Sequence, residues 1–136
     1  MKVLVVDDSQ AQCHMLGRML NQLGYSEVRS CTSVKAAQEM LSREQGFGIV
    51  LSDLHMPVAS GIDLLRWIRS NPGTAKLPFV MFTTEQQRQS ILEAARIGLQ
   101  SYMFKPVQKE TLKVKLYEIS KSHGIQPPTE ACVGMK

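Results

Sequence analysis

The stretch that decides the fold is Phe47-Gly48-Ile49-Val50-Leu51-Ser52-Asp53-Leu54-His55-Met56-Pro57. Its apolar run, residues 49–51, predicts a short buried strand. A loop is expected after this strand, and Pro57 is expected to end that loop. Asp53 stands where this strand would end. Such a carboxylate is either a functional group or a polar residue that closes the strand, and the rest of the chain decides between these two interpretations.

Segments of strand length alternate with segments of helical period along the chain. Apolar runs predict strands at residues 3–6, 48–51, 79–82 and 101–104, and a weaker run predicts one at 27–30. Apolar residues at helical spacing predict five helices with the buried stripes Leu16, Met19, Leu20 and Leu23; Val34, Ala37 and Leu41; Ile62, Leu65 and Ile68; Ile91, Ala94, Ala95 and Ile97; and Leu112, Leu116 and Ile119. The alternation predicts an α/β domain, a doubly wound sheet of five parallel strands with helices on both faces.

Polar residues and glycines mark the expected ends of these elements. Ser9 and Ser33 are expected to cap the first two helices at their N-termini, and Gly24 is expected to close the first. The last residues contain Pro127 and Pro128 and show no period. We therefore expect a domain of residues 1–122 followed by a flexible C-terminal tail, residues 123–136.

The composition is that of one globular domain. A chain of 136 residues can bury one core, and its apolar runs are far shorter than the roughly 20 residues that cross a bilayer. The net charge is +4, but the cationic residues are scattered, so we expect no direct binding of nucleic acid and no membrane insertion. Cys13, Cys31 and Cys132 form no disulfide or metal pattern, which is typical of a reduced, cytoplasmic protein.

Chemically active side chains follow four of the five predicted strands. In chain order they are Asp7 and Asp8, Asp53, Thr83 and Thr84, and Lys105. Ligands bind at the carboxyl ends of the strands in an open parallel sheet, so these residues are expected to share one edge. Each of them alone also has a local explanation, such as favouring a helix N-terminus. Their joint occurrence favours a functional site.

Three carboxylates at one edge repel one another unless a hard divalent cation binds between them. We expect Mg²⁺ at this edge, with Asp8, Asp53 and the backbone carbonyl of His55 as its ligands and with Asp7 bound to it directly or through a water molecule. Lys105 would supply a fixed positive charge on the other side. Two cations around one carboxylate suit phosphoryl transfer, with Asp53 as the nucleophile that forms an acyl phosphate.

Four motifs, in their order and spacing, resemble the receiver domain of two-component response regulators. They are Val5-Val6-Asp7-Asp8, Asp53-Leu54-His55-Met56-Pro57 with Gly61 beyond it, Thr83 after an apolar strand, and Tyr102-Met103-Phe104-Lys105-Pro106. The resemblance covers residues 1–122. It implies a flavodoxin-like fold with strand order 2-1-3-4-5 and a cis peptide bond before Pro106. It also implies a stand-alone receiver, with no output domain in these residues.

The function that this resemblance implies is signalling, not an enzyme activity on a separate substrate. Asp53 would accept a phosphoryl group from a sensor histidine kinase or a histidine phosphotransfer protein, with Lys105 and Thr83 completing the site. Thr83 and Tyr102 would form a switch. A downstream protein would then bind the face made by the fourth helix, the fifth strand and the fifth helix.

Three further positions are expected to set how long the acyl phosphate lasts. His55 and Glu85 each lie two residues beyond a site residue, where the family tunes hydrolysis, and the receiver is expected to take part in its own dephosphorylation. Thr84 stands where the family often has a smaller residue. A larger side chain there narrows access for phosphodonors and for the attacking water.

Other interpretations of the sequence stay open. The chain could be the receiver of a longer DNA-binding regulator, with the prolines of the tail beginning a linker. Aspartyl-phosphate phosphatases of the haloacid dehalogenase type also use a strand-end Asp and Mg²⁺, but they need a second Asp where this chain has His55. A receiver that only binds partners would lack a site residue, and none is missing. Val114 and Tyr117 form a candidate partner surface among lysines of the last helix.

Overall fold

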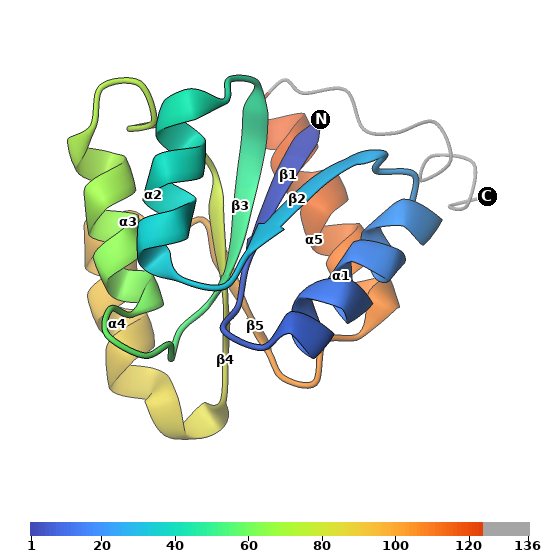
Figure 1. Ribbon diagram of the computed structural model, residues 1–136. Helices are drawn as coiled ribbons and strands as arrows, with labels where there is room; N and C mark the ends of the chain where they lie inside the picture. Colours follow the sequence, from blue (N-terminus) through green and yellow to red (C-terminus); the bar gives the residue numbers. More distant parts are fainter. Residues whose placement is uncertain (124–136) are drawn as a thin grey trace.

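The computed structural model describes residues 1–123, apart from the side chain of Glu85. Strands and helices alternate along the chain as predicted (Figure 1). The strands are β1 (Lys2–Val6), β2 (Glu27–Cys31), β3 (Phe47–Asp53), β4 (Phe79–Thr83) and β5 (Ser101–Phe104). The helices are α1 (Gln10–Gln22), α2 (Val34–Arg43), α3 (Gly61–Ser70), α4 (Arg88–Ile97) and α5 (Lys109–Ser122), with a 3₁₀ turn, η1 (Glu85–Gln87), before α4. Except for His123, the predicted tail lies outside the described residues.

All four strand pairs are parallel, and the strand order is β2-β1-β3-β4-β5, which confirms the predicted fold. The register aligns the carboxyl ends of the strands. Val6 lies opposite Ser52, Asp53 opposite Phe82, and Thr83 opposite Phe104. Because these ends coincide, the residues that follow the strands are brought to one edge of the sheet, which is the lower edge in Figure 1.

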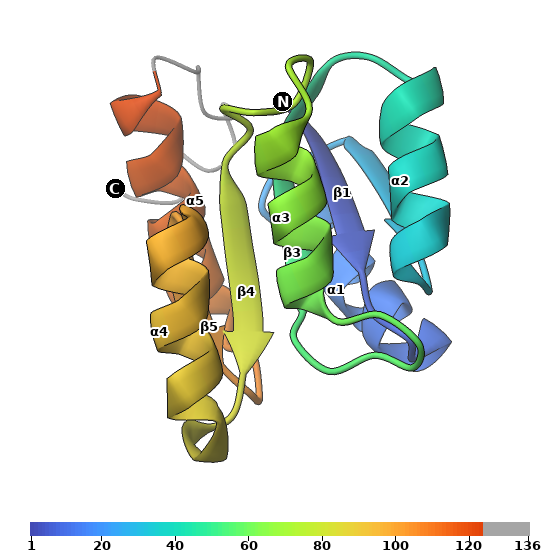
Figure 2. The same cartoon turned by 90° about the vertical axis from the view of Figure 1, so that its left-hand side faces the viewer.

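Helices cover both faces of the sheet and divide the core into two parts. Helices α1 and α5 pack on one face against alternate strand residues such as Val5 and Leu51, and α2, α3 and α4 pack on the other face against Leu4 and Val50 (Figures 1 and 2). The central strands β1, β3 and β4 are therefore buried on both faces. This double burial explains why their sequences are continuous apolar runs instead of alternating ones.

The edge elements are more exposed than the sequence pattern indicates. Only Cys31 is buried in β2 and only Met103 in β5, since no neighbouring strand shields the outer side of either one. In α4 only Ala94 is buried. The prediction that Ala95 belongs to the buried stripe is wrong, because α4 lies at the end of its layer and presents this position to solvent.

The predicted helix caps are confirmed. Ser9 accepts a hydrogen bond from the amide of Gln12, and Ser33 accepts one from the amide of Ala36. Gly24 follows the end of α1 with φ of 100°, a conformation that glycine adopts without the strain of a Cβ. None of the helices that the structure describes is long and apolar enough to cross a membrane.

Candidate functional site

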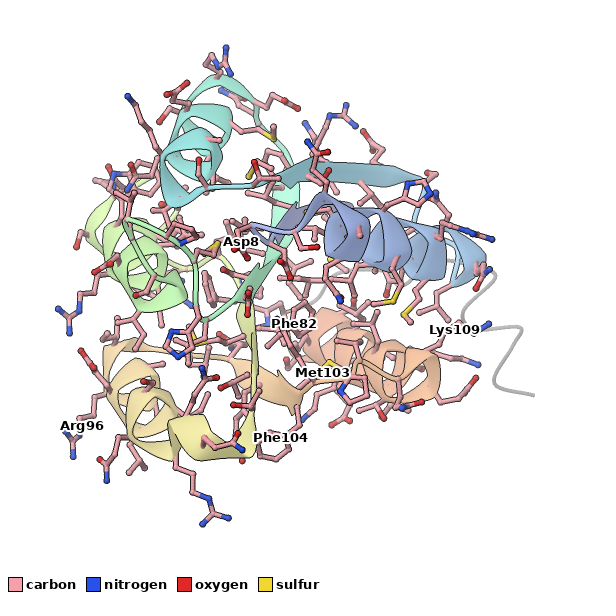
Figure 3. The ribbon with its side chains drawn as sticks, turned by 60° about the horizontal axis from the view of Figure 1, so that its bottom comes forward. Asp8, Phe82, Arg96, Met103, Phe104 and Lys109 are labelled. Carbon is pink, nitrogen blue, oxygen red and sulfur yellow. The ribbon has the colours of Figure 1, made fainter. Side chains whose placement is uncertain are left out.

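Three aspartates meet at the carboxyl edge of the sheet. Asp7 directly follows β1, Asp8 comes next, and Asp53 ends β3. One carboxylate oxygen from each of them lies within 4.8 Å of the other two. Asp7 and Asp53 are buried and Asp8 is exposed. Figure 3, which brings this edge forward, shows Asp8 beside the start of α1 and Phe104 near α4 on the other side of the edge.

Lys105 is the cation that contacts these carboxylates. Its Nζ lies 2.8 Å from Asp53 Oδ1 and 3.8 Å from Asp7 Oδ2. Its backbone amide donates to the carbonyl of Thr83 at 2.8 Å, so the end of β4 holds the start of the loop that carries it. The peptide bond from Lys105 to Pro106 is cis, as the resemblance implied. Among the described residues, Lys105 pairs with two of the three carboxylates, which leaves the cluster with an excess of negative charge.

Asp7 has a buried carboxylate oxygen that a cation could bind. Its Oδ1 accepts a hydrogen bond from the amide of Ser9 at 2.9 Å, but its buried Oδ2 accepts none from the residues that the structure describes. Burial raises the pKa of Asp7, and the charges of Asp53 and Asp8 add to this, against the Ser9 amide and the Lys105 ammonium. A buried carboxylate oxygen without a hydrogen bond, in a cluster of oxygen ligands, fits a hard cation such as Mg²⁺.

The loop after Asp53 is closed at both ends by backbone hydrogen bonds. The amide of Leu54 donates to the carbonyl of Phe82, and the amide of Gly61 donates to the carbonyl of Leu54 at 2.8 Å. A Cβ on Gly61 would lie 2.5 Å from the backbone oxygen of Asp53, so only glycine lets α3 begin this close to β3. His55 is exposed in this loop. The expected role of its backbone carbonyl as a metal ligand stays a prediction.

The loop also contains a strained residue that sequence reasoning missed. Val58 has φ of 72° and is fully exposed. A β-branched residue rarely adopts this left-handed conformation, because its Cβ approaches the following carbonyl oxygen. No pattern of hydrophobic residues reports such a conformation, so only the proximity of Pro57 could have hinted at a tight turn.

Thr83 ends β4 with a buried side chain that points to the start of α4. Its hydroxyl donates to Oε1 of Gln87, and the same oxygen accepts from the amide of Thr84 at 2.9 Å. Sequence reasoning missed Gln87, whose only signal is its place four residues after Thr83 at a helix start. Thr84 is half-buried. Glu85 begins η1, but its side chain lies outside the described residues.

Tyr102 is 41% exposed on β5, and its ring meets that of Phe104 edge to face at 5.6 Å. The structure therefore places it on the outer surface beside α4, not against Asp53. A groove of about 440 Å³ lies there, and its lining residues are Thr84, Arg88, Ile91, Leu92, Tyr102 and Phe104. This groove lies on the face that the resemblance assigned to a downstream protein.

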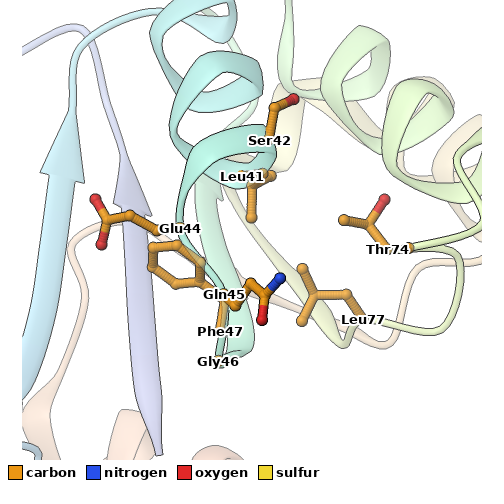
Figure 4. Close-up of a pocket in the computed structure, with 9 residues that line it drawn as sticks. Leu41, Ser42, Glu44, Gln45, Gly46, Phe47, Thr74 and Leu77 are labelled. Atoms are coloured by element: carbon orange, nitrogen blue, oxygen red, sulfur yellow. The ribbon is translucent and has the colours of Figure 1, made fainter.

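A second hollow lies at the opposite edge of the sheet and does not resemble a phosphoacceptor site. It measures about 390 Å³ between the end of α2 and the loop before β4 (Figure 4). Glu44 is the one carboxylate among the nine residues that line it, and Lys2 and Arg29 both pair with this group. The acidic cluster is therefore the stronger candidate for chemistry.

Comparison with known proteins agrees with this geometry. The profile of the response regulator receiver domain matches residues 3–117. The chain is 37% identical over 119 residues to chemotaxis protein CheY-3 of Vibrio cholerae, covering 88% of this chain and 91% of that protein. It is 34% identical over 119 residues to chemotaxis protein CheY of Pseudomonas aeruginosa, covering 88% and 95%.

A solved structure shows the same arrangement of the backbone. The chemotaxis response regulator CheY4 of Vibrio cholerae superposes with a TM-score of 0.79 and 30% sequence identity, covering 87% of this chain and 97% of that one. The family match spans all five strands and the acidic edge that they form. The chain therefore belongs to the response regulator receiver domain family, the signalling modules of two-component systems.

Proposed function

We propose that the protein is a phosphoacceptor in which Asp53 receives a phosphoryl group from a phosphohistidine. The donor is a sensor histidine kinase or a histidine phosphotransfer protein, and residues 1–122 form the receiver. One observation carries this proposal: a carboxylate oxygen of Asp53 lies 2.8 Å from the ammonium of Lys105, and Asp53 also belongs to the cluster of three aspartates. A nucleophile so placed has a cation in contact, and its acidic neighbours could hold a second one.

The transfer exchanges one bond to phosphorus for another. A carboxylate oxygen of Asp53 attacks the phosphorus, and an oxygen–phosphorus bond forms while the bond from phosphorus to the donor nitrogen breaks. The donor imidazole leaves with the electron pair. Lys105 then has a phosphoryl oxygen in place of a carboxylate oxygen as its partner, which compensates the charge that the transfer brings to this edge.

Asp7, Asp8, Asp53 and the backbone carbonyl of His55 are the groups that would hold Mg²⁺. When bound, this cation would neutralise charge on the phosphoryl oxygens. The buried Oδ2 of Asp7, which accepts no hydrogen bond from the described residues and lies 3.8 Å from the Lys105 ammonium, would gain a close partner when the cation binds. We expect the protein to be inactive as a phosphoacceptor when divalent cations are removed.

The signal leaves through the groove between α4 and β5. Thr83 carries a buried hydroxyl that can donate to a phosphoryl oxygen. Tyr102 is exposed and lines the groove. Leu92 and Phe104 are also exposed there, at 54% and 44%. An apolar groove of this kind suits a segment of a downstream protein, and a rearrangement of Thr83 and Tyr102 would change its shape.

The side chains of His55, Thr84 and Glu85 are proposed to set the lifetime of the acyl phosphate. His55 is exposed in the loop after Asp53, where it can orient or obstruct the attacking water. The half-life of the phosphorylated protein, compared between wild type and His55→Ala, measures this effect. An unchanged half-life would remove His55 from the proposal.

The phosphoacceptor function itself is tested by intact mass after incubation with acetyl phosphate. Wild type should gain one phosphoryl group with Mg²⁺ and none with a chelator. Asp53→Asn should gain none under either condition, while Asp63→Asn, a control in the N-terminal turn of α3, should behave like wild type. A wild type that gains no phosphoryl group, or an Asp53→Asn variant that gains one equally well, would contradict the proposal.

A further inference from the structure

Gln87 makes the contact that decides where the hydroxyl of Thr83 points. Its Oε1 accepts a hydrogen bond from Thr83 Oγ1 and a second one from the amide of Thr84. The amide of Thr84 can only donate, so the atom of Gln87 that faces it is the oxygen. The carbonyl of Thr84 also lies within reach of the hydroxyl, at the longer distance of 3.3 Å.

A hydroxyl has one proton, so Thr83 can donate to only one acceptor at a time. In this structure that acceptor belongs to Gln87. A phosphoryl oxygen on Asp53 would be a charged and therefore stronger acceptor. The bond to Gln87 must break before Thr83 can donate to the phosphoryl group, and its free energy is subtracted from that of the new bond.

We propose that Gln87 is a positioning residue that holds Thr83 in the unphosphorylated arrangement and so sets the free-energy cost of switching. This inference rests on the proposed function, because it presumes that Asp53 carries the phosphoryl group. It adds a second partner to the switch, one that competes with the phosphoryl group for the proton of Thr83.

The place of Gln87 in the fold connects this competition to the output groove. Gln87 ends η1, and the chain passes from the tip of β4 through this turn into α4 (Figure 2). Thr84 and Arg88, on either side of the turn, both line the groove beside Tyr102. Loss of the bond from Thr83 releases one of the two hydrogen bonds that the side chain of Gln87 accepts across the turn, while the backbone bond from its amide to the carbonyl of Thr84 remains.

The other end of α4 is held separately. The guanidinium of Arg69 in α3 donates to the carbonyl of Gly98 through Nε at 3.0 Å and through Nη2 at 2.7 Å. Gly98 directly follows the last residue of α4. Because this anchor does not involve Thr83, release of Gln87 affects the first turn of the helix and leaves the last turn in place.

The test measures the affinity of the Mg²⁺-loaded protein for beryllofluoride, a mimic of the phosphoryl group, by titration calorimetry. Gln87→Leu and Gln87→Met remove the competing acceptor and replace it with an apolar side chain of high helix propensity. Both should bind beryllofluoride roughly threefold to tenfold more tightly than wild type, the range for one net hydrogen bond. The remaining carbonyl of Thr84 places the expected gain nearer to threefold.

Two comparisons separate this effect from a general change in stability. Gln86→Leu makes the same substitution in the same turn, at an exposed side chain, and should leave the affinity at the wild-type value. In a Thr83→Val background, which lacks the hydroxyl, Gln87→Leu should no longer raise the affinity. A side chain with only a structural role would lower the affinity or change it equally in both backgrounds.

The possible results distinguish a failure of the proposed role of Gln87 from a failure of the phosphoacceptor function. If wild type binds beryllofluoride and the Gln87 variants bind it no more tightly, or gain as much in the Thr83→Val background, the role of Gln87 is wrong and the phosphoacceptor function stands. If wild type does not bind beryllofluoride in the presence of Mg²⁺, both proposals are overturned.

Discussion

At the scale of single residues, the acidic cluster combines two buried carboxylates with one exposed one, and Asp7 is the member with a buried oxygen that lacks a hydrogen bond. Burial and its acidic neighbours raise its pKa, and its Oδ2 accepts no hydrogen bond from the described residues. A group held in this state lowers the stability of the protein without a metal, and a bound cation would relieve this cost. Stability and function therefore oppose each other at this residue.

Asp7→Asn should raise the free energy of unfolding of the metal-free protein by roughly 1 kcal/mol, because it removes a buried charge. The amide oxygen of Asn still accepts the hydrogen bond from Ser9. In the same variant Mg²⁺ should no longer raise the melting temperature. Thermal unfolding with and without Mg²⁺ measures both effects, and Asp8→Asn, at an exposed carboxylate, should change the metal-free stability less.

The pH dependence of this effect has a definite sign. Folding raises the pKa of Asp7 above 3.8, so its contribution to stability is complete below that value and is lost as the pH rises through the folded pKa. The advantage of Asp7→Asn should accordingly be small near about pH 4 and full at neutral pH. An advantage that does not depend on pH would show that the charge of Asp7 is not its cause.

Val58 lets the cost of the loop conformation be measured on its own. Asn tolerates the left-handed region better than a β-branched residue, so Val58→Asn should raise the free energy of unfolding by about 1 kcal/mol. Val114→Asn is the matched control, because Val114 is exposed on α5 and valine and asparagine have similar helix propensity. Urea unfolding that shows no gain for Val58→Asn over this control would contradict the strain.

At the scale of elements, the site depends on how closely α3 approaches β3. Gly61→Ala would place a Cβ 2.5 Å from the backbone oxygen of Asp53 and 3.2 Å from the Cα of Leu54. Neither contact is with a side chain that can move aside. We expect a loss of roughly 2 kcal/mol in the free energy of unfolding, measured by urea titration, and slower phosphorylation by acetyl phosphate.

Gly17→Ala is the control for this substitution. In the middle of α1, a Cβ on Gly17 would meet no heavy atom of the other described elements within 4 Å. Alanine there should stabilise the helix by up to about 1 kcal/mol. Equal effects of the two substitutions would show that the close approach of α3 to β3 does not constrain the site.

The contact between α3 and the end of α4 depends on Arg69. Besides the carbonyl of Gly98, its guanidinium binds those of Ala75 and Leu77 through Nη1, so one side chain satisfies three carbonyls in two loops. Lysine has one ammonium and cannot span this set. Arg69→Lys should lower the free energy of unfolding by roughly 2 kcal/mol in urea titration.

Arg66→Lys, on the same helix, serves as the control for Arg69. Arg66 pairs with Glu93 at an exposed position, and such pairs contribute little to stability. The expected loss is about 0.5 kcal/mol or less. Arg69→Lys and Arg66→Lys variants of equal stability would contradict the claim that the hydrogen bonds of Arg69 stabilise the fold.

At the scale of the whole molecule, the sequence was informative wherever a residue's role follows from its position along a strand. Central strands are buried on both faces, so their apolar runs predicted both the sheet and the residues at its carboxyl edge. Asp7, Asp53 and Lys105 meet there as the order of the strands requires. The sequence therefore predicted which groups come together before any side-chain geometry was known.

The sequence was less informative about contacts between side chains and distant backbone. Arg69 and Gly98 are far apart in the chain, and their hydrogen bonds leave no periodic signal. Gln87 reads as an ordinary polar residue until the direction of the Thr83 hydroxyl is known. The exposure of Ala95 depends on the position of α4 at the end of its layer. These features follow from packing in three dimensions, which hydrophobic patterning does not report.

We propose that Asp53, and no other carboxylate of the cluster, accepts the phosphoryl group. Reduction of an acyl phosphate with borohydride converts the aspartate that carries it to homoserine, which peptide sequencing by mass spectrometry locates. After incubation with acetyl phosphate and Mg²⁺, we predict homoserine at position 53 and unmodified aspartate at positions 7 and 8. Homoserine at position 7 or 8 would contradict the assignment of Asp53 as the phosphoacceptor. Absence of homoserine from all three positions would contradict it as well.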